Sequence, residues 1–435
     1  MSPLVMGLLG LGLMLLLIAI RMPVGFAMGV SGFLGIAVLY DGNWTAAAGS
    51  LGIVPYAMAS NYIFTTVPLF ILMGEFAFRS GISAELFVAA RHWMGHLPGG
   101  LAMASIGTCA GFAAASGSSV ATAAAIGTIT IPEMRRGGVH PRLATAACAA
   151  GGTLGIMIPP SLGMVIYGLT ADQSIGRLLV AGIIPGILLT LAMILAVLWV
   201  AWRDPGAAPR QAASSWPTRL RATRGVAGIL ALFALVMGGI YGGVFTPTEA
   251  AAVGALGSLG IALIKRQLTW RGLMQALLQT GITTCMIFII IIGSHILNIF
   301  LSATGFPAAL SKLLTGLALP PAIVIALIVA IYVVLGCFLD VLAMIVLTVP
   351  IVLPVVIGLG YDPIWFGVVI VLVMEIALIT PPVGMNVYVI KSVVPDVRLG
   401  TIFSGIWPFL VSMIIVVGLL ILLPDVTLFL PRLMF

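Results

Sequence analysis

The sequence predicts an all-α polytopic membrane protein, built as an inverted repeat of two halves. Hydrophobic residues make up 61% of its 435 residues and charged residues only 7%, whereas a soluble domain carries about 25% charged residues. The pair Pro159-Pro160 lies inside a long apolar stretch and returns in a second apolar stretch as Pro381-Pro382. Composition therefore predicts the membrane, and the recurring pair predicts the two halves.

The charge and cysteine patterns exclude other classes of protein. The net charge is +7, but most basic residues lie in short links between apolar runs, so we expect a lipid bilayer and no nucleic-acid partner. The four cysteines are far apart in apolar sequence and fit neither a metal-ligand spacing nor a disulfide framework. The first apolar run, 4–20, has no basic start and no clear cleavage site, which indicates a retained helix.

The repeat is visible in the spacing of several proline motifs. Pro381 lies 222 residues after Pro159 (381 − 159), and His140-Pro141 recurs as Asp362-Pro363 at the same separation. Further matches follow in the same order, with separations that drift by only a few residues. Such a run of ordered matches indicates a duplicated unit.

Each half contains five predicted crossings, since a span needs about 20 residues. The first half (1–202) and the second half (225–435) are joined by a linker at 203–224. The crossings are expected at 4–20, 22–40, 61–78, 142–170 and 178–202, and again at 225–243, 248–264, 280–301, 363–392 and 401–423. Of these, 4–78 and 225–301 hold the scaffold helices, while 142–170 and 363–392 are broken at the prolines. An odd number of crossings inverts the second half relative to the first.

One segment of each half predicts a re-entrant helical hairpin. Residues 101–134 are too short for two full spans and too long for one, and the polar run 116–119 interrupts them. Two helices of about 15 residues would each reach roughly 22 Å, which is only partway through a hydrocarbon core of about 30 Å. The counterpart in the second half is 321–357, with its tip at 336–340.

Basic residues predict the orientation in the membrane. With the N-terminus outside, only Arg177, Lys312 and Arg432 lie on the outer side, and the other lysines and arginines lie inside. This distribution follows the positive-inside rule, and the reverse orientation violates it. The linker 203–224 is then cytoplasmic.

The proline pairs predict ion-binding backbone in mid-membrane. Proline cannot donate the helical hydrogen bond to the carbonyl four residues back, so the pairs are expected to free the carbonyls of Gly155 and Ile156, and of Ala377 and Leu378. At membrane depth such carbonyls are tolerated only inside protein or along a wet cavity. Two broken helices at corresponding places of two halves are typical of the binding site of a secondary transporter.

Polar residues near the two tips supply the remaining candidates. The hydroxyls of Ser116, Ser118 and Ser119 suit a hard cation or a polar substrate, although small residues also simply allow close helix packing. Asp340 is interpreted either as a ligand or as a helix cap. Thr380 stands beside the opened carbonyls, and Asn386 is placed to hydrogen-bond a substrate.

Two acidic residues lie in mid-span. Glu375 is on the helix broken at Pro381, near the proposed site, and Glu75 is expected to bond to a neighbouring helix. A proton-relay role is an alternative for either residue. No P-loop, zinc-protease helix or serine-hydrolase elbow is visible, so ATP is not expected as the energy source of this chain.

Three motifs resemble a known family. They are Gly151 to Ser161 (GGTLGIMIPPS), the tip Ser116 to Ser119 (SGSS) and Ile379 to Asn386 (ITPPVGMN), which are similar to those of the large membrane subunit of TRAP transporters, the DctM type. The resemblance covers essentially the whole chain. It implies sodium-driven uptake of an organic acid, such as a C4-dicarboxylate or sialic acid, across the bacterial inner membrane. It also implies an elevator mechanism, a small membrane subunit (DctQ type) and a periplasmic substrate-binding protein (DctP type).

The resemblance also implies which residues bind the ions. The sodium (Na+) ligands map onto Ser116, Ser119, Gly155, Ile158, Pro160, Gly336, Ala377, Thr380 and Val383, and Ala377 stands where the family often has glycine. The candidate substrate contacts are Ser118, Ser161, Asp340 and Asn386. The alternatives are a stand-alone sodium/carboxylate symporter of related fold and a passive anion channel on the same scaffold. An intramembrane enzyme is disfavoured, because the sequence contains no recognisable nucleophile–base set.

Overall fold

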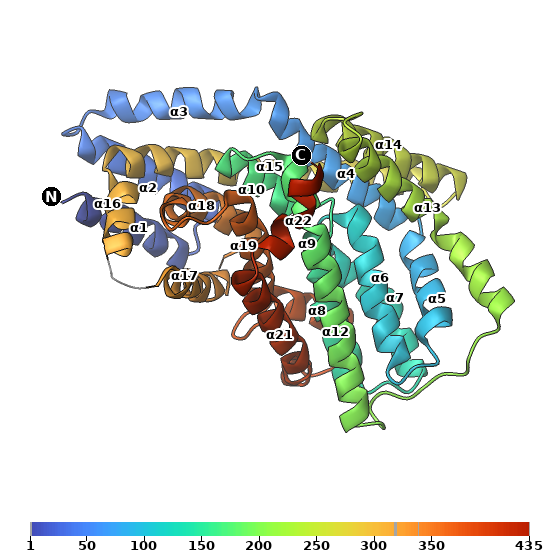
Figure 1. Ribbon diagram of the computed structural model, residues 1–435. Coiled ribbons are helices and arrows are strands. Elements are labelled where there is room, and N and C mark those ends of the chain that lie inside the picture. The colour runs from blue at the N-terminus through green and yellow to red at the C-terminus, as the bar shows by residue number, and fades with distance from the viewer. Residues whose placement is uncertain (1, 317–319, 338, 435) are drawn as a thin grey trace.

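The protein is all-helical, as predicted. The computed structural model describes residues 2–316, 320–337 and 339–434, and within these ranges every regular element is a helix (Figure 1). The helices of the first half are α1 Pro3–Ala19, α2 Val24–Leu39, α3 Trp44–Ala59, η1 Tyr62–Thr65, α4 Thr66–Arg79, α5 Ile82–Met94, α6 Gly100–Ser116, α7 Ser119–Arg136, α8 Pro141–Gly152, α9 Leu154–Met157, α10 Leu162–Ala171, α11 Ile175–Ala181 and α12 Ile183–Arg203.

The second half repeats this order of helices. It consists of α13 Trp216–Tyr241, α14 Pro247–Ile264, α15 Trp270–Ala303, α16 Phe306–Gly316, α17 Pro321–Gly336, α18 Val341–Gly358, α19 Pro363–Ala377, α20 Met385–Val393 and α21 Leu399–Leu422, followed by α22 Asp425–Met434. The hairpin α6–α7 thus corresponds to α17–α18, and the broken helix α8–α10 corresponds to α19–α20. The inverted orientation of the halves stays a prediction.

Several helices are long and apolar enough to cross a membrane. Within the described residues, seven single helical segments meet that condition, and the pair Pro141–Met157 and Leu162–Ala171 makes an eighth span if its 42° bend is counted inside one crossing. The remaining apolar helices, such as α1 and α2, are shorter. The chain is therefore a multi-pass membrane protein.

Two features of the scaffold differ from the sequence prediction. The helix α3 was not predicted, and together with η1 and α4 it covers the stretch that the second half spans with the single helix α15. Ser60 ends α3, and the Asn61 side chain accepts a hydrogen bond from the Ile63 N–H at 3.1 Å to start the next turn. The corresponding stretch of α15, 286–292, is wholly apolar and continues without a break.

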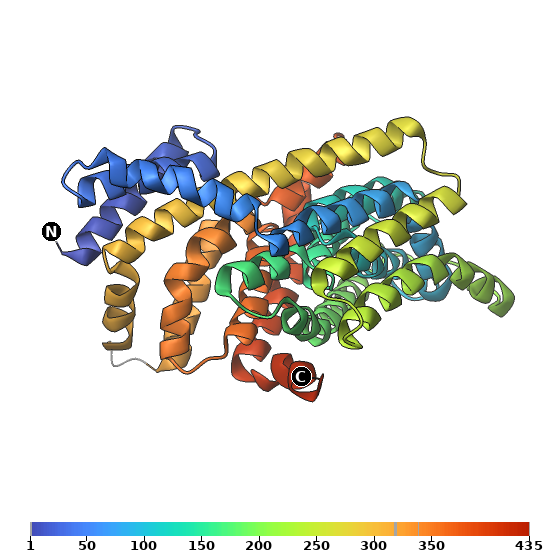
Figure 2. The ribbon, with the colours of Figure 1, turned by 90° about the horizontal axis from the view of Figure 1, so that it is seen from above.

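The expected crossing at 280–301 is therefore only part of a longer helix. The 34 residues of α15 correspond to about 51 Å at 1.5 Å per residue, well beyond a hydrocarbon core of about 30 Å. Figure 2 shows α15 running across the molecule from the end that holds the N-terminus to the end that holds α13 and α14.

The segment that joins the two halves is shorter than the predicted linker at 203–224. The helix α13 begins at Trp216 rather than near residue 225. The extended stretch before it is tied to the ends of the first-half helices by backbone hydrogen bonds, from the Gln211 N–H to the Gly95 carbonyl at 2.9 Å and from the Gly99 N–H to the Ala208 carbonyl at 3.0 Å. The joint between the halves is thus a packed segment of the protein.

The scaffold helices of the two halves pack on each other. The helix α2 lies along α15, and α14, the counterpart of α2, lies along α4. Glycines allow the close approach, because a Cβ built at Gly32 would lie 2.6 Å from the Leu297 backbone, and such small residues let membrane helices come into backbone contact. Figures 1 and 2 both place α1 to α3 of the first half at the end that carries α16 of the second.

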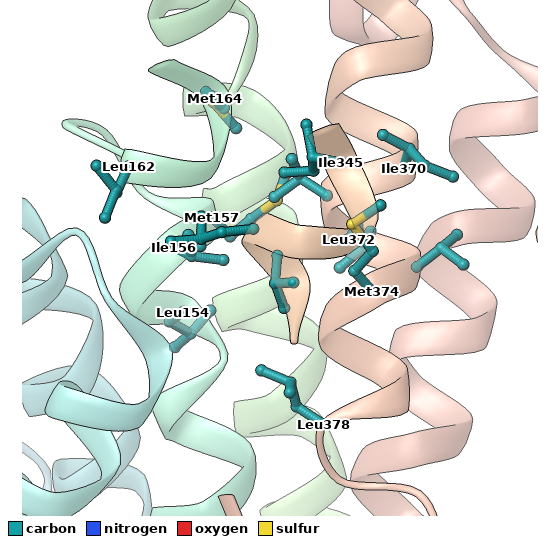
Figure 3. Close-up of a cluster of buried hydrophobic side chains, with 14 of the residues drawn as sticks. Leu154, Ile156, Met157, Leu162, Met164, Ile345, Ile370, Leu372, Met374 and Leu378 are labelled. Atoms are coloured by element: carbon teal, nitrogen blue, oxygen red, sulfur yellow. The ribbon is translucent and has the colours of Figure 1, made fainter. Parts of the chain in front are cut away.

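Each broken helix also packs on a hairpin helix of the other half. The helix α10 of the first half packs on α18 of the second, and α20 of the second half packs on α7 of the first. Buried apolar side chains fill the space where the first break meets the second half, and Figure 3 shows Ile156 and Met157 directed toward Ile345 and Met374. This packing brings both hairpin tips and both breaks to the middle of the molecule.

Candidate functional site

The first tip is a two-residue turn between α6 and α7. Gly117 has a φ of +62°, a left-handed conformation that glycine adopts without steric cost. Ser118 then caps α7, since its side chain accepts a hydrogen bond from the Ala121 N–H at 3.4 Å. The Ser116 hydroxyl donates to the Ser118 carbonyl at 3.3 Å. Hydroxyl and carbonyl oxygens are therefore gathered within four residues.

This tip contacts the first break directly. The Leu162 N–H, just after the prolines, donates to the Gly117 carbonyl at 3.3 Å. On the other side of the break, a Cβ built at Gly155 would lie 2.5 Å from the Ser118 carbonyl oxygen and closer still to the Thr122 hydroxyl. Gly155 is thus needed for the close approach of the two segments. The peptide bond Pro159–Pro160 is cis, and both prolines are buried.

Ser161 holds the two arms of the first break together. Its side chain caps α10 by accepting a hydrogen bond from the Met164 N–H at 3.2 Å, and its hydroxyl donates to the Ile156 carbonyl. Ser161 is completely buried. Ile158 is half-buried and packs against Gly186 of α12.

The second tip meets the second break through smaller contacts. A Cβ built at Gly336, the last residue of α17, would lie 2.5 Å from the Cβ of Ala377. The Cys337 thiol lies 3.8 Å from the Pro381 carbonyl oxygen. Asp340 caps α18, and its carboxylate accepts a hydrogen bond from the Leu342 N–H at 3.1 Å. The capping interpretation of Asp340 is therefore confirmed, and residue 338 of this tip lies outside the described residues.

Three of the carbonyls that the prolines were expected to free have partners inside the protein. The Ile156 carbonyl accepts from Ser161, the Ala377 carbonyl from the Thr380 N–H at 3.3 Å, and the Leu378 carbonyl from the Asn386 N–H at 3.0 Å. None of these donors is the N–H four residues further along, so the usual helical partner is missing as predicted, and a residue at another spacing replaces it. Each carbonyl oxygen still has a second lone pair that can face a cation.

The two tips and both broken helices line a partly open cavity of about 60 Å³. Ser118 and Ser119 line it from the first tip, Asp340 lines it from the second, and Glu375 lines it from α19. The Ser119 hydroxyl donates to the Glu375 carboxylate at 2.6 Å across 256 residues of sequence. Three of the predicted site residues therefore meet in one place, together with Glu375.

The remaining candidates lie around this centre rather than in it. Thr380 is half-buried, and its hydroxyl donates to the Ile376 carbonyl at 2.6 Å. Val383 is 37% exposed. Asn386 is completely buried, and its side-chain N–H group donates to the Ala149 carbonyl of α8 at 3.3 Å. The structure does not place Val383 or Asn386 on the cavity wall, and their roles stay predictions.

The scaffold backs the first tip from the side of α4. A Cβ built at Gly74 would lie 2.9 Å from the Ser116 carbonyl oxygen. The neighbouring Glu75 forms an ion pair with Arg79 of its own helix. The prediction that Glu75 bonds to a neighbouring helix is therefore wrong, because a residue one turn away supplies its partner.

Comparisons with known proteins agree with this architecture. A family model described as the DctM component of the tripartite ATP-independent periplasmic transporter matches residues 11–426. The C4-dicarboxylate TRAP transporter large permease protein DctM of Pseudomonas aeruginosa is 35% identical over 408 residues, which are 93% of this chain and 94% of that relative. The isethionate TRAP transporter permease protein DctMQ of Oleidesulfovibrio alaskensis is 32% identical over 96% of this chain and 65% of its own length.

A solved structure supports the same fold. The Alcanivorax borkumensis YdaH transporter superposes with a TM-score of 0.63 at 15% sequence identity, over 96% of this chain and 97% of that one. The relatives are transporter permeases, so this chain is a transport protein and not an enzyme. The chain belongs to the DctM family, the large permease component of the tripartite ATP-independent periplasmic (TRAP) transporters.

Proposed function

We propose that this permease imports a small organic acid across the bacterial inner membrane and that sodium ions drive the import. The substrate belongs to the class that includes C4-dicarboxylates, sialic acid and similar carboxylates. The names of two relatives refer to anions, a C4-dicarboxylate and the sulfonate isethionate. The basic residues at the predicted cytoplasmic side orient the N-terminus to the periplasm.

One observation carries this proposal: in each half a hairpin tip meets a Pro-Pro break. At the first meeting point, Gly117 and Ser118, which lie between Ser116 and Ser119, approach the carbonyl of Pro160 and the backbone of Gly155. At the second, Gly336 lies against Ala377, three residues before Thr380. Hydroxyl and carbonyl oxygens are the ligands that hard cations such as sodium prefer. These two places are the proposed sodium sites. The cavity between them is proposed to connect the two sites energetically.

The substrate is proposed to reach the permease from other proteins. The family description names a tripartite periplasmic system, which agrees with a small membrane subunit and a soluble periplasmic binding protein as partners. The relative named DctMQ is longer than this chain, which covers 65% of it, and this length agrees with a small subunit fused to the permease there.

The movement is proposed to be of the elevator type. The hairpins and broken helices form the inner body, and α1 to α4 with α13 to α15 form the scaffold around it. Gly74 of α4 has no side chain and lies close to the Ser116 carbonyl, so this part of α4 presents no side chain to the first tip. The Ser294 hydroxyl of α15 donates to the Val346 carbonyl of α18 at 2.6 Å. Contacts of these kinds have to slide or break when the inner body moves.

Uptake into proteoliposomes tests the proposal. The permease is reconstituted with its small subunit, and the periplasmic binding protein is added outside with radiolabelled succinate or N-acetylneuraminate. We expect the substrate to accumulate above its outside concentration only with an inward sodium gradient and only with the binding protein. A potassium gradient of the same size is the control.

Two results would replace the proposal by another function. Accumulation that needs sodium but no binding protein would make the chain a stand-alone symporter. Flux that is independent of sodium, runs only down the gradient and rises linearly with substrate would make it a passive anion channel.

A further inference from the structure

A buried carboxylate without a cationic partner lies at the centre of the molecule. Glu375 has no exposed surface. One of its oxygens, Oε2, accepts the hydrogen bond from Ser119, and the other, Oε1, has no hydrogen-bond partner among the described residues. None of the ion pairs formed by the described residues includes Glu375 or Asp340.

The surroundings of Glu375 make this arrangement costly. The helix α19 is apolar on both sides of it and every side chain from Ile364 to Ala377 is buried. Removing a charged group from water is unfavourable unless another charge or several hydrogen bonds compensate it. Ionisable residues inside membrane segments are accordingly rare and usually have a function. One hydroxyl donor does not satisfy the four lone-pair directions of a carboxylate.

The space beside Glu375 has the size of an ion rather than of an organic substrate. The cavity measures about 60 Å³, and a water molecule in the liquid occupies about 30 Å³. Pockets for drug-sized ligands start at about 300 Å³. The polar groups on its wall are the Ser118 and Ser119 hydroxyls and the two carboxylates of Asp340 and Glu375, which all offer oxygen.

We propose that this cavity is a further alkali-cation site, with Glu375 as its charged ligand. The inference rests on the proposed sodium coupling and adds a central ion to the two at the tips. The free oxygen of Glu375 binds the cation, and the charge of Asp340, which lines the same cavity, attracts it. Because Ser119 donates its hydrogen to Glu375, its oxygen lone pairs stay available for the neighbouring tip site, so the two ions share one hydrogen-bonded pair.

Counting bound ions tests this site. The full-length permease in lipid nanodiscs is titrated with ²²Na⁺ at constant ionic strength, and the ions per chain are measured by equilibrium dialysis at saturation. We expect the wild-type chain to bind one ion more than the pair of tip sites can hold. The variant Glu375→Gln keeps the shape of the side chain and removes its charge, so it should bind one ion fewer than wild type.

Glu75→Gln is the matched control, because Glu75 is paired with Arg79 outside the cavity, and it should bind as many ions as wild type. A wild-type chain that binds only two ions overturns the proposal without relying on any variant, and it leaves the tip sites standing. An unchanged count in a folded Glu375→Gln chain overturns it as well. A chain that binds no sodium at all removes the proposed function together with this inference.

Discussion

The two breaks share a Pro-Pro pair and have very different surroundings. At the first break both prolines and Ser161 are buried, and the tip is bonded to the break between Gly117 and Leu162. At the second break residues 381–383 are exposed, with Val383 at 37%. The same motif therefore makes a covered site in one half and an exposed one in the other.

The difference has its cause in the segments that face each break. The first tip presents a glycine with positive φ among three serines, so its backbone can lie directly on the break. The second tip meets Ala377, whose methyl group occupies the space that a glycine would leave open. The proposed elevator movement needs one side closed while the other is open, and this asymmetry between the two breaks agrees with that proposal.

Gly155→Ala is expected to have the largest effect, because it separates the first tip from the first break. The added Cβ would lie 2.5 Å from the backbone oxygen of Ser118, and such overpacking costs about 1–3 kcal/mol. We expect the sodium concentration for half-maximal uptake to rise by about tenfold or more. Uptake is measured in proteoliposomes over a series of sodium concentrations.

Gly260→Ala is the control for this substitution, because no atom lies within 4 Å of a Cβ built at that position of α14. Unchanged sodium dependence in Gly155→Ala would mean that the covered break is not an ion site.

Ser119→Ala and Thr380→Ala compare the two sites through their hydroxyls. Ser119 is buried and bonded to Glu375 at 2.6 Å, whereas Thr380 is half-buried and bonded within its own helix turn. We expect the sodium requirement to rise by about tenfold for Ser119→Ala and about threefold for Thr380→Ala, since a hydrogen bond contributes about 0.5–1.5 kcal/mol. The same uptake series measures both.

Thr128→Ala removes a hydroxyl that donates to the Ala125 carbonyl on α7, away from the tip, and it should not change the sodium requirement. If Ser119→Ala and Thr380→Ala both behave like this control, the proposed cation sites are wrong.

Gly336→Ala tests the looser second contact. The new methyl group would lie 2.5 Å from the methyl group of Ala377. The exposed residues 381–383, which follow Ala377, can shift to relieve this contact. We therefore expect a smaller rise in the sodium requirement, of about threefold, below the 1–3 kcal/mol of a rigid core. Ala377→Gly in the same chain should restore the wild-type value, which a double-mutant cycle measures. Additive effects of the two substitutions would contradict a direct contact between these residues.

The helices and the two breaks could be predicted because their signals are local. An apolar run of about 20 residues and a proline pair act within their own segment, so the hairpins at 101–134 and 321–357 appear as α6–α7 and α17–α18. The helix α3 was missed because its end depends on Ser60 and Asn61 in a short and less apolar stretch.

The composition of the central cavity could not be predicted in the same way. Ser119 and Glu375 are 256 residues apart, and no periodicity relates a tip of one half to a helix of the other. A single Glu in the run from Val368 to Ile379 was the only signal for this contact. The hydrogen bonds that the carbonyls of Ile156 and Leu378 accept were missed for a related reason. They form only when the chain folds back after each break.

The smallest expected effect concerns an ion pair that ties the two halves at the far end of the first hairpin. Arg135 at the end of α7 lies 2.8 Å from Asp396 in the loop after α20, and the guanidinium lowers the pKa of the Asp396 carboxyl. A carboxyl with a lowered pKa stabilises the folded state above its ordinary pKa, and the stabilisation is lost as the pH falls through the lowered value. Asp396→Asn should therefore lower the melting temperature by about 1 °C at neutral pH.

The difference in melting temperature between wild type and Asp396→Asn should disappear at acidic pH. It should also disappear at about 1 M salt, where exposed charges are screened within about 3 Å. Asp425→Asn is the matched control, because it removes the exposed pair with Arg432 inside α22 and leaves the contact between the halves in place. If Asp396→Asn also raises the sodium requirement while Asp425→Asn does not, the pair controls how far the exposed second break can move against the first hairpin. A difference that grows as the pH falls would contradict the ion pair as its cause.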